Sequence, residues 1–379
     1  MRFAEWRKAC FLTPVVLSGI LTVILTTVPA FAQASGSFIG GFKTISTVAS
    51  TVPANGDQNP YGVVVVPESV GNLVQGDVLV SNFNNNGSNG GLQGTGTTIV
   101  QISPTGKVSL FARINARKLP GACPGGVGLT TALVVLQRGW VIVGSLPTSN
   151  GMAATAKAGC LIVLNNYGQA VETFSGGVIN GPWDMTALDL NKMAVLFVTN
   201  VLNGTVAANG QVVNKGTVVR IVLSVPRQGY GMPVRQSTTV IGSGFAERTD
   251  PTALVVGPTG VGLASNNTLY VADSANSRID AIPYALTRSG SAGTGNKVTS
   301  GGRINDPLGL TIAPKGDILT ANGNDGNIVE TTPGGSQIAH KLVDNTGGTG
   351  AGCLFGIAIA SNPGVYFVDD CSNTLDLLH

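Results

Sequence analysis

Short runs of β-branched and other apolar residues alternate along this chain with clusters of glycine, asparagine, aspartate and proline. Apolar runs of about four to eight residues between such clusters are typical of β-strands joined by turns. Beyond residue 32, no long stretch keeps the 3.6-residue spacing of an amphipathic helix. The pattern therefore predicts an all-β protein.

One arrangement recurs along the chain: a strand, a turn, a second strand ending in a small polar residue, a hairpin, and two further strands. The second strands are the clearest markers, and their ends are spaced by about 57 residues on average. They lie at residues 77–82, 140–145, 195–200, 268–273, 317–322 and 364–369. A period of this size with four short strands per unit is typical of a β-propeller, and six units account for the chain beyond residue 32.

The two ends of the repeat favour a closed ring. The last unit stops after its third strand at 374–379, and the strand that it lacks is predicted at 43–49. Pairing these strands in one blade would remove two open sheet edges. We therefore predict that residues 33–379 form a single six-bladed β-propeller domain, closed by an N-terminal strand that completes the last blade. The alternative is a β-sandwich followed by a tail.

Residues 1–32 have the features of a secretory signal peptide. Basic residues precede an apolar stretch at 11–28, and a small-x-small cleavage pattern ends at Ala32. The alternative is an uncleaved membrane anchor, since the apolar stretch approaches spanning length. We expect cleavage after Ala32, no membrane span in the mature chain, and export to the periplasm or the extracellular space.

The composition excludes several functions. Only 11% of the 379 residues are charged and the net charge is +3, with scattered basic residues, which disfavours nucleic-acid binding. The two histidines, His340 and His379, leave no material for a multi-histidine metal site. No Gly-x-Ser-x-Gly motif or phosphate-binding loop occurs. We expect a monomer whose partner is a protein, a peptide or a carbohydrate.

The cysteines follow the repeat. Cys10 lies in the predicted leader, and the four that remain imply disulfides in an exported protein. Cys123 and Cys353 each precede the first strand of a blade, while Cys160 and Cys371 lie near the second hairpin of the same blades. These equivalent positions meet at one end of a sheet, which predicts the pairs Cys123–Cys160 and Cys353–Cys371. A redox-active pair, the alternative, lacks Cys-x-x-Cys spacing.

A resemblance to a known repeat family is carried by blades near the C-terminus. Residues 269–279 (Leu-Tyr-Val-Ala-Asp-Ser-Ala-Asn-Ser-Arg-Ile) resemble the core of an NHL repeat, and residues 306–316 resemble its first strand. The resemblance is good over 251–338 and weaker elsewhere. It implies a propeller distantly similar to the gluconolactonase and strictosidine-synthase-like group, which uses the mouth of the channel for metal-assisted or acid–base chemistry.

The resemblance does not extend to a lactonase site. Gluconolactonase-like sites require a glutamate on a first strand, and none is recognisable in this sequence. Glu68 is expected in a turn, whereas Glu172 and Glu330 are expected on outer or edge strands. This departure puts lactonase activity in doubt.

The candidate site lies at one face of the ring. In a blade, the start of the first strand and the end of the second strand meet at the same face, and three long hairpins at 83–97, 146–159 and 201–216 should raise one side of its rim. The candidate ligand-binding residues at this channel mouth are Tyr61, Asn82, Trp183, Asp184, Asn200, Asp273, Asn322 and Asp369.

These residues support two hypotheses. The first, which the sequence favours, is an exported binding protein that holds a ligand or partner at the long-hairpin face. The second is a metal-assisted hydrolase or lyase, because carboxylate and amide oxygens suit Ca²⁺ or another divalent cation. Its predicted ligands are Asp273, Asp369, Asn200 and Asn322. Alternatively, these four side chains cap turns through local hydrogen bonds.

Overall fold

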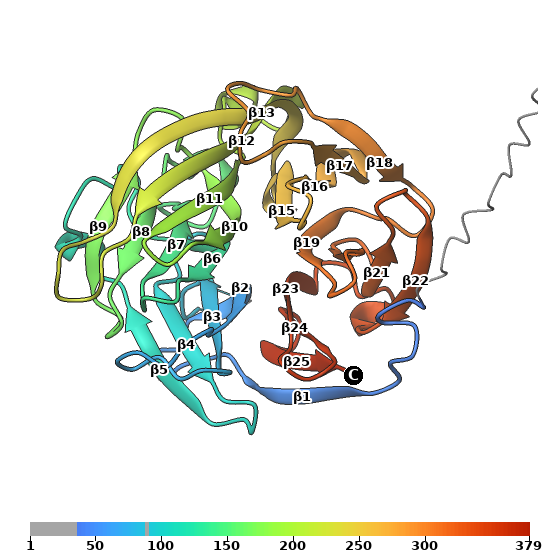
Figure 1. Ribbon diagram of the computed structural model, residues 1–379, viewed down its shortest axis with the longest axis horizontal. Helices are drawn as coiled ribbons and strands as arrows, with labels where there is room; N and C mark the ends of the chain where they lie inside the picture. The colour runs from blue at the N-terminus through green and yellow to red at the C-terminus, as the bar shows by residue number, and fades with distance from the viewer. Residues whose placement is uncertain (1–35, 88–90) are drawn as a thin grey trace, which may run out of the picture. The chain divides into compact units, whose positions relative to one another are not determined.

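Six antiparallel sheets surround a central channel (Figure 1). The computed structural model describes residues 36–87 and 91–379, so the predicted leader at 1–32, with Cys10, lies outside the described residues. In the part of the chain that is described, no helix combines the length and the apolar character needed to cross a membrane. The predicted all-β, six-bladed propeller is confirmed.

Four of the blades contain four strands each, ordered from the channel outward as they occur in the chain. Blade 1 consists of β2 (Gln58–Val65), β3 (Val78–Asn84), β4 (Thr98–Ile102) and β5 (Val108–Arg113). Blade 2 consists of β6 (Leu129–Val135), β7 (Val141–Ser145), β8 (Cys160–Leu164) and β9 (Ala170–Ser175). Blade 4 consists of β15 (Pro258–Leu263), β16 (Leu269–Asp273), β17 (Arg278–Ile282) and β18 (Asn296–Ser300). Blade 5 consists of β19 (Pro307–Ile312), β20 (Ile318–Asn322), β21 (Asn327–Thr331) and β22 (Gln337–Leu342).

Blade 3 departs from this plan because it has five strands. Its outer strand β13 extends from Val234 to Asp250 and is much longer than the outer strands of the other blades. Several bulges bend β13 along its partner, and the chain then turns back into a short fifth strand. This extension brings residues 252–256 to the mouth of the channel. The strands of blade 3 are β10 (Pro182–Asp189), β11 (Met193–Asn200), β12 (Val213–Ser224), β13 and β14 (Leu254–Val256).

Blade 6 is closed by the N-terminal strand, as predicted. Strand β1 (Ile45–Ser50) pairs antiparallel with β25 (Thr374–Leu378), and β24 (Val365–Asp369) and β23 (Leu354–Ile359) continue the sheet inward. In Figure 1, β1 runs along the outside of this last blade. Both ends of the described chain therefore share one sheet, which leaves no open strand edge between the first and last blades.

A second contact holds the N-terminal segment, and it corrects an expectation. Glu330 lies on β21, the third strand of blade 5 and not an outer strand, and it is buried. Its carboxylate accepts hydrogen bonds from the backbone nitrogens of Phe38 at 2.6 Å and Ile39 at 2.9 Å. The glutamate thus has a structural role at the outside of the ring.

The first strands approach each other closely around the channel. A Cβ atom at Gly260, Gly309 or Gly356 would lie 2.2–2.3 Å from a carbonyl oxygen of the next first strand. No side chain fits at that distance, so glycine is required at these positions. Phe355 immediately precedes Gly356 and therefore lies in this closely packed part of the ring.

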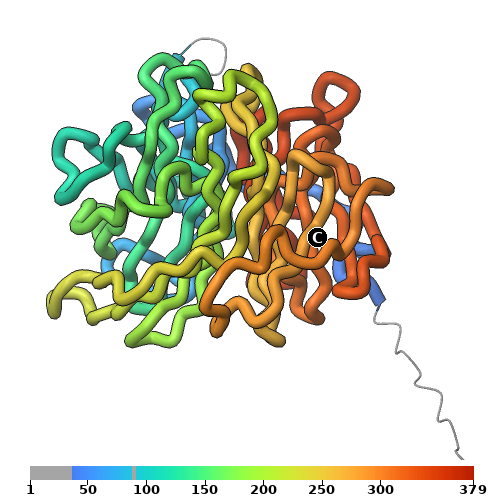
Figure 2. The backbone as a smooth tube through the Cα atoms, turned by 90° about the horizontal axis from the view of Figure 1, so that it is seen from above, coloured from blue at the N-terminus to red at the C-terminus, as the bar shows by residue number. Residues whose placement is uncertain are grey.

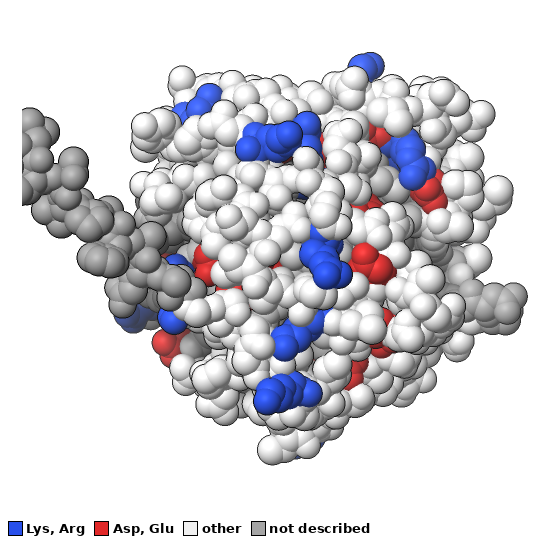
Figure 3. Space-filling view, turned by 90° about the vertical axis from the view of Figure 1, so that its right-hand side faces the viewer, with Lys and Arg blue, Asp and Glu red and all other residues white. Residues whose placement is uncertain are grey.

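The hairpins that follow the second strands project from one face, the mouth face. The tube in Figure 2 shows loops 146–159 and 201–212, in green and yellow-green, rising at this end. Short helical turns lie in the connections: η2 (Ala116–Lys118), η3 (Ala153–Thr155), α1 (Thr205–Ala208), η4 (Ser274–Asn276) and η5 (Thr346–Gly348). On the side of the molecule in Figure 3, lysine and arginine side chains are separated by uncharged residues.

Both predicted disulfides are confirmed. Cys123 and Cys160 are bonded with their Cα atoms 5.2 Å apart, and Cys353 and Cys371 with theirs 4.9 Å apart. Disulfides persist in oxidising compartments, so the two bonds indicate a location outside the cytoplasm.

Candidate functional site

A cavity of about 290 Å³ opens at the mouth face, and we call it the mouth cavity. Three kinds of segment line it: the starts of first strands, the hairpins after second strands, and the links between blades. The residues that bear on its chemistry are Asn59, Tyr61, Gln93, Trp183, Asp306, Phe355 and Asp370. They come from four blades, so the cavity exists only in the closed ring.

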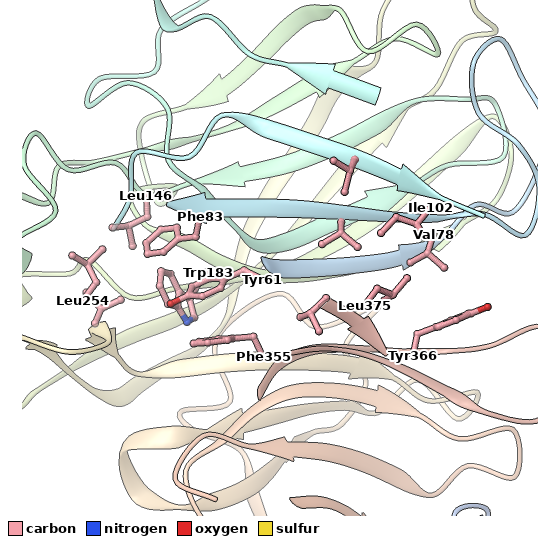
Figure 4. Packing of buried hydrophobic residues seen from close by; sticks show 14 of the residues in the cluster. Tyr61, Val78, Phe83, Ile102, Leu146, Trp183, Leu254, Phe355, Tyr366 and Leu375 are labelled. Carbon is pink, nitrogen blue, oxygen red and sulfur yellow. The ribbon is translucent and has the colours of Figure 1, made fainter. Parts of the chain in front are cut away.

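Aromatic rings form one wall of the mouth cavity. Tyr61 stacks between Phe83, with ring centroids 4.5 Å apart, and Phe355, with centroids 3.9 Å apart. Trp183 meets Tyr61 edge-on at 5.8 Å and Phe83 at 5.5 Å. Figure 4 shows these four rings gathered at one end of the buried cluster, with Leu254 beside them. Rings that pack on each other in this way form a rigid apolar surface.

A carboxyl group, Asp370, stands beside this wall. With the Asn59 amide oriented to match its neighbours, its nitrogen donates to Asp370 Oδ1 at 2.8 Å. Tyr61 is buried, and burial together with the charge of Asp370 raises the pKa of its hydroxyl. Burial raises the pKa of Asp370 to about 7, and the nearby charge of Asp369 acts in the same direction. Asp370 therefore titrates close to neutral pH.

A second carboxyl group, Asp306, lies at the start of blade 5 and also lines the cavity. Burial raises the pKa of Asp306 to about 6; the charge of Arg248 opposes this shift and that of Asp250 adds to it. Arg248 itself forms an ion pair with Asp250. Its positive charge is therefore shared with another carboxylate.

The backbone is strained at two lining residues. Asn59 has φ 64° and Asp306 has φ 53°. These values lie in the left-handed region of backbone conformation, which residues other than glycine adopt infrequently. Asn59 and Asp306 occupy equivalent places, immediately before a proline in a first strand. Residues with a strained backbone are concentrated at functional sites, where the surrounding structure maintains the strain.

Two buried oxygen atoms of the cavity wall have no protein hydrogen-bond donor, namely Asp306 Oδ1 and Gln93 Oε1. The amide nitrogen of Gln93 is used, because it donates to the carbonyl of Thr252 and links blade 1 to the extension of blade 3. A buried acceptor without a donor costs free energy.

The predicted site residues separate into three groups. Tyr61 and Trp183 line the mouth cavity. Asp184 lines a different cavity of about 370 Å³, formed by the first strands along the channel. There its Oδ1 accepts a hydrogen bond from the backbone nitrogen of Met185 at 2.7 Å, and burial raises the pKa of Asp184 to about 7.

The third group consists of the polar residues at the ends of second strands. They are buried, line neither cavity, and bind the chain that enters or leaves their own blade. Each of the three asparagines in this group bonds the backbone. The amide nitrogen of Asn82 donates to the carbonyl of Thr51 at 3.0 Å. The amide oxygens of the other two accept from backbone nitrogens, Asn200 from Asn180 at 3.2 Å and Asn322 from Asn305 at 3.3 Å. These bonds tie each asparagine to the segment that enters its own blade, 17–31 residues away, and are not the local turn caps that the sequence suggests.

The two aspartates of the predicted cation site also have local partners. Asp273 Oδ2 accepts from Arg278 Nη2 at 2.9 Å and from Asn276 Nδ2 at 2.9 Å, while Asp369 Oδ1 accepts from the nitrogen of Ser372 at 3.1 Å. Within residues 36–87 and 91–379, neither aspartate belongs to a close group of three acidic, histidine or cysteine ligand atoms. Each of the two aspartates is therefore held by groups of its own blade.

Sequence reasoning missed the main polar residues of the mouth cavity. The repeat selected Asp369 because it ends a second strand, whereas the next residue, Asp370, lines the cavity. A signal was present: Asp370 adjoins a disulfide cysteine, and Asn59 and Asp306 both precede a proline at the start of a first strand. No signal in the sequence places Gln93 at the cavity.

Comparison with known proteins supports the fold. No protein-family model matches the chain, and no curated protein matches it in sequence. Among solved structures, it is similar to a gluconolactonase from Xanthomonas campestris (TM-score 0.53, 12% identity, 89% of this chain and 90% of that one). It is also similar to the PQQ-bound aldose sugar dehydrogenase from Streptomyces coelicolor (TM-score 0.53, 16% identity, 89% and 99%). A luciferin-regenerating enzyme has TM-score 0.51 at 9% identity over 88% and 94%.

These identities establish the class of fold and nothing finer. The chain is a six-bladed β-propeller of the architecture that the gluconolactonase shares, which confirms the expected structural resemblance. The activities named for these proteins belong to those proteins. The function of this chain has to be argued from its own mouth cavity.

Proposed function

We propose that this protein is an exported binding protein that holds a small ligand in the mouth cavity. The observation that carries the proposal is a preformed cavity of about 290 Å³ that combines an aromatic wall with two half-buried carboxyl groups. Apolar concave sites with a few convergent polar groups are the usual form of small-molecule sites, and this volume lies at the lower end of their range.

The size and polarity of the cavity limit the ligand. A single sugar ring or one peptide side chain fits the volume. The carboxyl groups of Asp306 and Asp370, which line the cavity, favour a ligand rich in hydrogen-bond donors. A larger partner would contact the cavity through one such group while resting on the hairpins of blades 1–3.

Export forms part of the proposal. The signal-peptide features of residues 1–32 and the two disulfides agree on an oxidising compartment. Mass determination of the protein recovered from the culture medium and the periplasm tests this point. A mature N-terminus at Gln33 is expected, and an intact N-terminus in the cytoplasm would contradict export.

Tryptophan fluorescence tests ligand binding. Trp183 lines the cavity and Trp140 lies in blade 2, so a Trp140→Phe variant without residues 1–32 reports from Trp183 alone. We expect a saturable change in emission with members of a panel of monosaccharides, sugar lactones and amines. The same change should weaken in Phe355→Ala, because that ring forms the wall.

A matched control is available in Glu68→Gln. Glu68 is exposed in the turn after β2, at the opposite end of the strand from Asn59, and this substitution should leave binding unchanged. If no compound gives a saturable change, or if Phe355→Ala binds as well as its parent, the mouth cavity is not the ligand site.

A second candidate function is acid–base catalysis at Asp370, which one observation favours. A half-buried carboxyl group with a pKa of about 7 can both accept and donate a proton near neutral pH. Asn59 orients this carboxyl group and Tyr61 stands next to it. Hydrolysis of a sugar lactone, followed by titration of the released acid, tests this function.

The variant Asp370→Asn separates binding from catalysis. It should abolish turnover while the Trp183 signal of ligand binding is retained, and turnover that survives in Asp370→Asn would rule this function out. Parallel assays with EDTA and with added Ca²⁺ test the metal-assisted hypothesis. Because the predicted cation ligands are hydrogen-bonded to other residues of the chain, we expect no effect of either.

A further inference from the structure

We infer that the mouth cavity selects a small organic cation: an ammonium group carried on an apolar or aromatic body. This inference rests on the proposed function and names the class of its ligand. Three features of the cavity support it, namely its uncompensated negative charge, the acceptor character of its carboxyl groups, and its aromatic wall.

The charge of the cavity is negative. Asp306 and Asp370 both line it, and none of its lining residues, taken from the described part of the chain, is a lysine, an arginine or a histidine. Arg248, the positive group that acts on Asp306, is already paired with Asp250. Buried carboxylates without a cation are costly, so a positively charged ligand is stabilised where a neutral or negative one is not.

The titratable groups that line the cavity are the carboxyl groups of Asp306 and Asp370. Ionised carboxylates are acceptors only, and an ammonium group offers up to three donors and no acceptor, which matches them. A carboxylate or phosphate ligand brings only acceptors.

The apolar part of the wall suits the body of such a ligand. The rings of Tyr61, Trp183 and Phe355 line the cavity together with Leu308 and Val255. An ammonium group near aromatic rings gains electrostatic attraction from them, and more so in a buried site than in an exposed one. Carboxylates and rings therefore act on the same part of the ligand.

The ionisation of the two carboxyl groups predicts how binding depends on pH. Asp370 faces Asp369 and Tyr61, and Asp306 faces Arg248 and Asp250. Since the pKa of Asp306 is about 6 and that of Asp370 about 7, both groups lose their protons between pH 5 and pH 8. The affinity for a cation should rise over that interval, and the affinity for a neutral compound should not.

The experiment compares three probes of nearly equal shape in the Trp140→Phe background: phenethylammonium, 2-phenylethanol and phenylacetate. Phenethyltrimethylammonium, which does not titrate, serves for the pH series. We expect the ammonium probe to bind about tenfold or more tightly than the alcohol, and the carboxylate not to bind. Asp306→Asn and Asp370→Asn should each lower the affinity for the ammonium probe about tenfold. Glu68→Gln, which removes the same charge, is the control.

The outcomes distinguish the selectivity for a cation from the proposed function, ligand binding in the mouth cavity. If the alcohol or a monosaccharide binds in a Phe355-dependent manner and the ammonium probe does not, the inference is overturned and the proposed function stands. If no probe and no panel compound binds, both fall. Unchanged ammonium binding in an Asp306→Asn, Asp370→Asn double variant with native circular dichroism, or stoichiometric displacement of the probe by Ca²⁺, would also overturn the inference.

Discussion

Two aspartates at the mouth face, the buried Asp273 in blade 4 and the half-buried Asp370 in blade 6, differ in what compensates their charge. Asp273 is fully buried but bound by Arg278, whose side chain is 25% exposed, and by Asn276. Asp370 has the Asn59 amide as its neutral partner and a second carboxylate next to it in the chain. Burial alone therefore does not identify a site; burial of a charge without a cation does.

The comparison extends to the blades themselves. Arg278 also binds the buried Asp280 at 2.8 Å, so both aspartates of the NHL-like turn have their cation within blade 4. In blade 5, Asp325 has a similar role through the amides of Asn322 and Asn327. The mouth cavity instead depends on residues from several blades, and its carboxyl groups are left for a ligand.

The largest effect is expected from the disulfides. Replacing Cys353 and Cys371 by serine should lower the free energy of unfolding by about 3 kcal/mol, because the unfolded chain gains freedom, and should also disturb the hairpin that carries Asp370. Urea unfolding measures the first effect and the Trp183 emission the second. The Cys123→Ser, Cys160→Ser double variant is the control, with a similar or larger loss of stability but normal ligand binding. Equal disturbance of the cavity by both pairs would contradict this view.

The next effect concerns the compensated aspartate. Arg278→Ala leaves Asp273 and Asp280 buried without their cation, and we expect a loss of about 2–3 kcal/mol, after allowance for the exposure of the arginine. The midpoint of urea unfolding at pH 7 measures it. Arg227→Ala, at an exposed arginine, should change the midpoint little. Similar midpoints for the two variants would show that the ion pairs of blade 4 contribute nothing.

Substitution by asparagine should have opposite signs at the two aspartates. At pH 8, Asp370→Asn removes an ionised half-buried carboxylate and should stabilise the protein by about 1 kcal/mol. Asp273→Asn removes the partner of Arg278 and should destabilise it by about 1–2 kcal/mol. Thermal unfolding of both variants beside the parent protein checks the signs. A loss of stability in both would show that Asp370 is as well compensated as Asp273.

The smallest effect is the pH dependence of the stability difference between Asp370→Asn and the parent protein. A pKa of about 7 in the folded state, above the ordinary value of 3.8, means that the folded protein holds the proton of Asp370 more tightly than the unfolded chain does. The contribution of this group to stability is therefore full below pH 4 and is lost as the pH rises towards 7. At pH 5 the stabilisation by Asp370→Asn should fall below about 0.5 kcal/mol. A difference that does not change between pH 5 and pH 8 would place the pKa of Asp370 near its ordinary value.

The comparison also explains which parts of the structure were predictable. The repeat in the second strands determined the number of blades, because each strand and its turn are specified by neighbouring residues. The same register paired the cysteines correctly and identified β1 as the strand that completes blade 6. Blade 3 was described incompletely, since the bulges that bend β13 towards the mouth have no local signal that distinguishes them from a turn.

By itself, the sequence determined the class of fold, the closure of the ring and the two disulfides, because all of these follow from a local pattern repeated six times. The tertiary structure alone decided which polar residues remain without compensation. Asn59 and Asp370 meet only when the last blade closes against the first, and Gln93 reaches Thr252 only across the channel. Whether a polar group finds a hydrogen-bond partner or an opposite charge depends on residues that are distant in the chain. The set of residues that lines the mouth cavity is therefore a property of the closed ring.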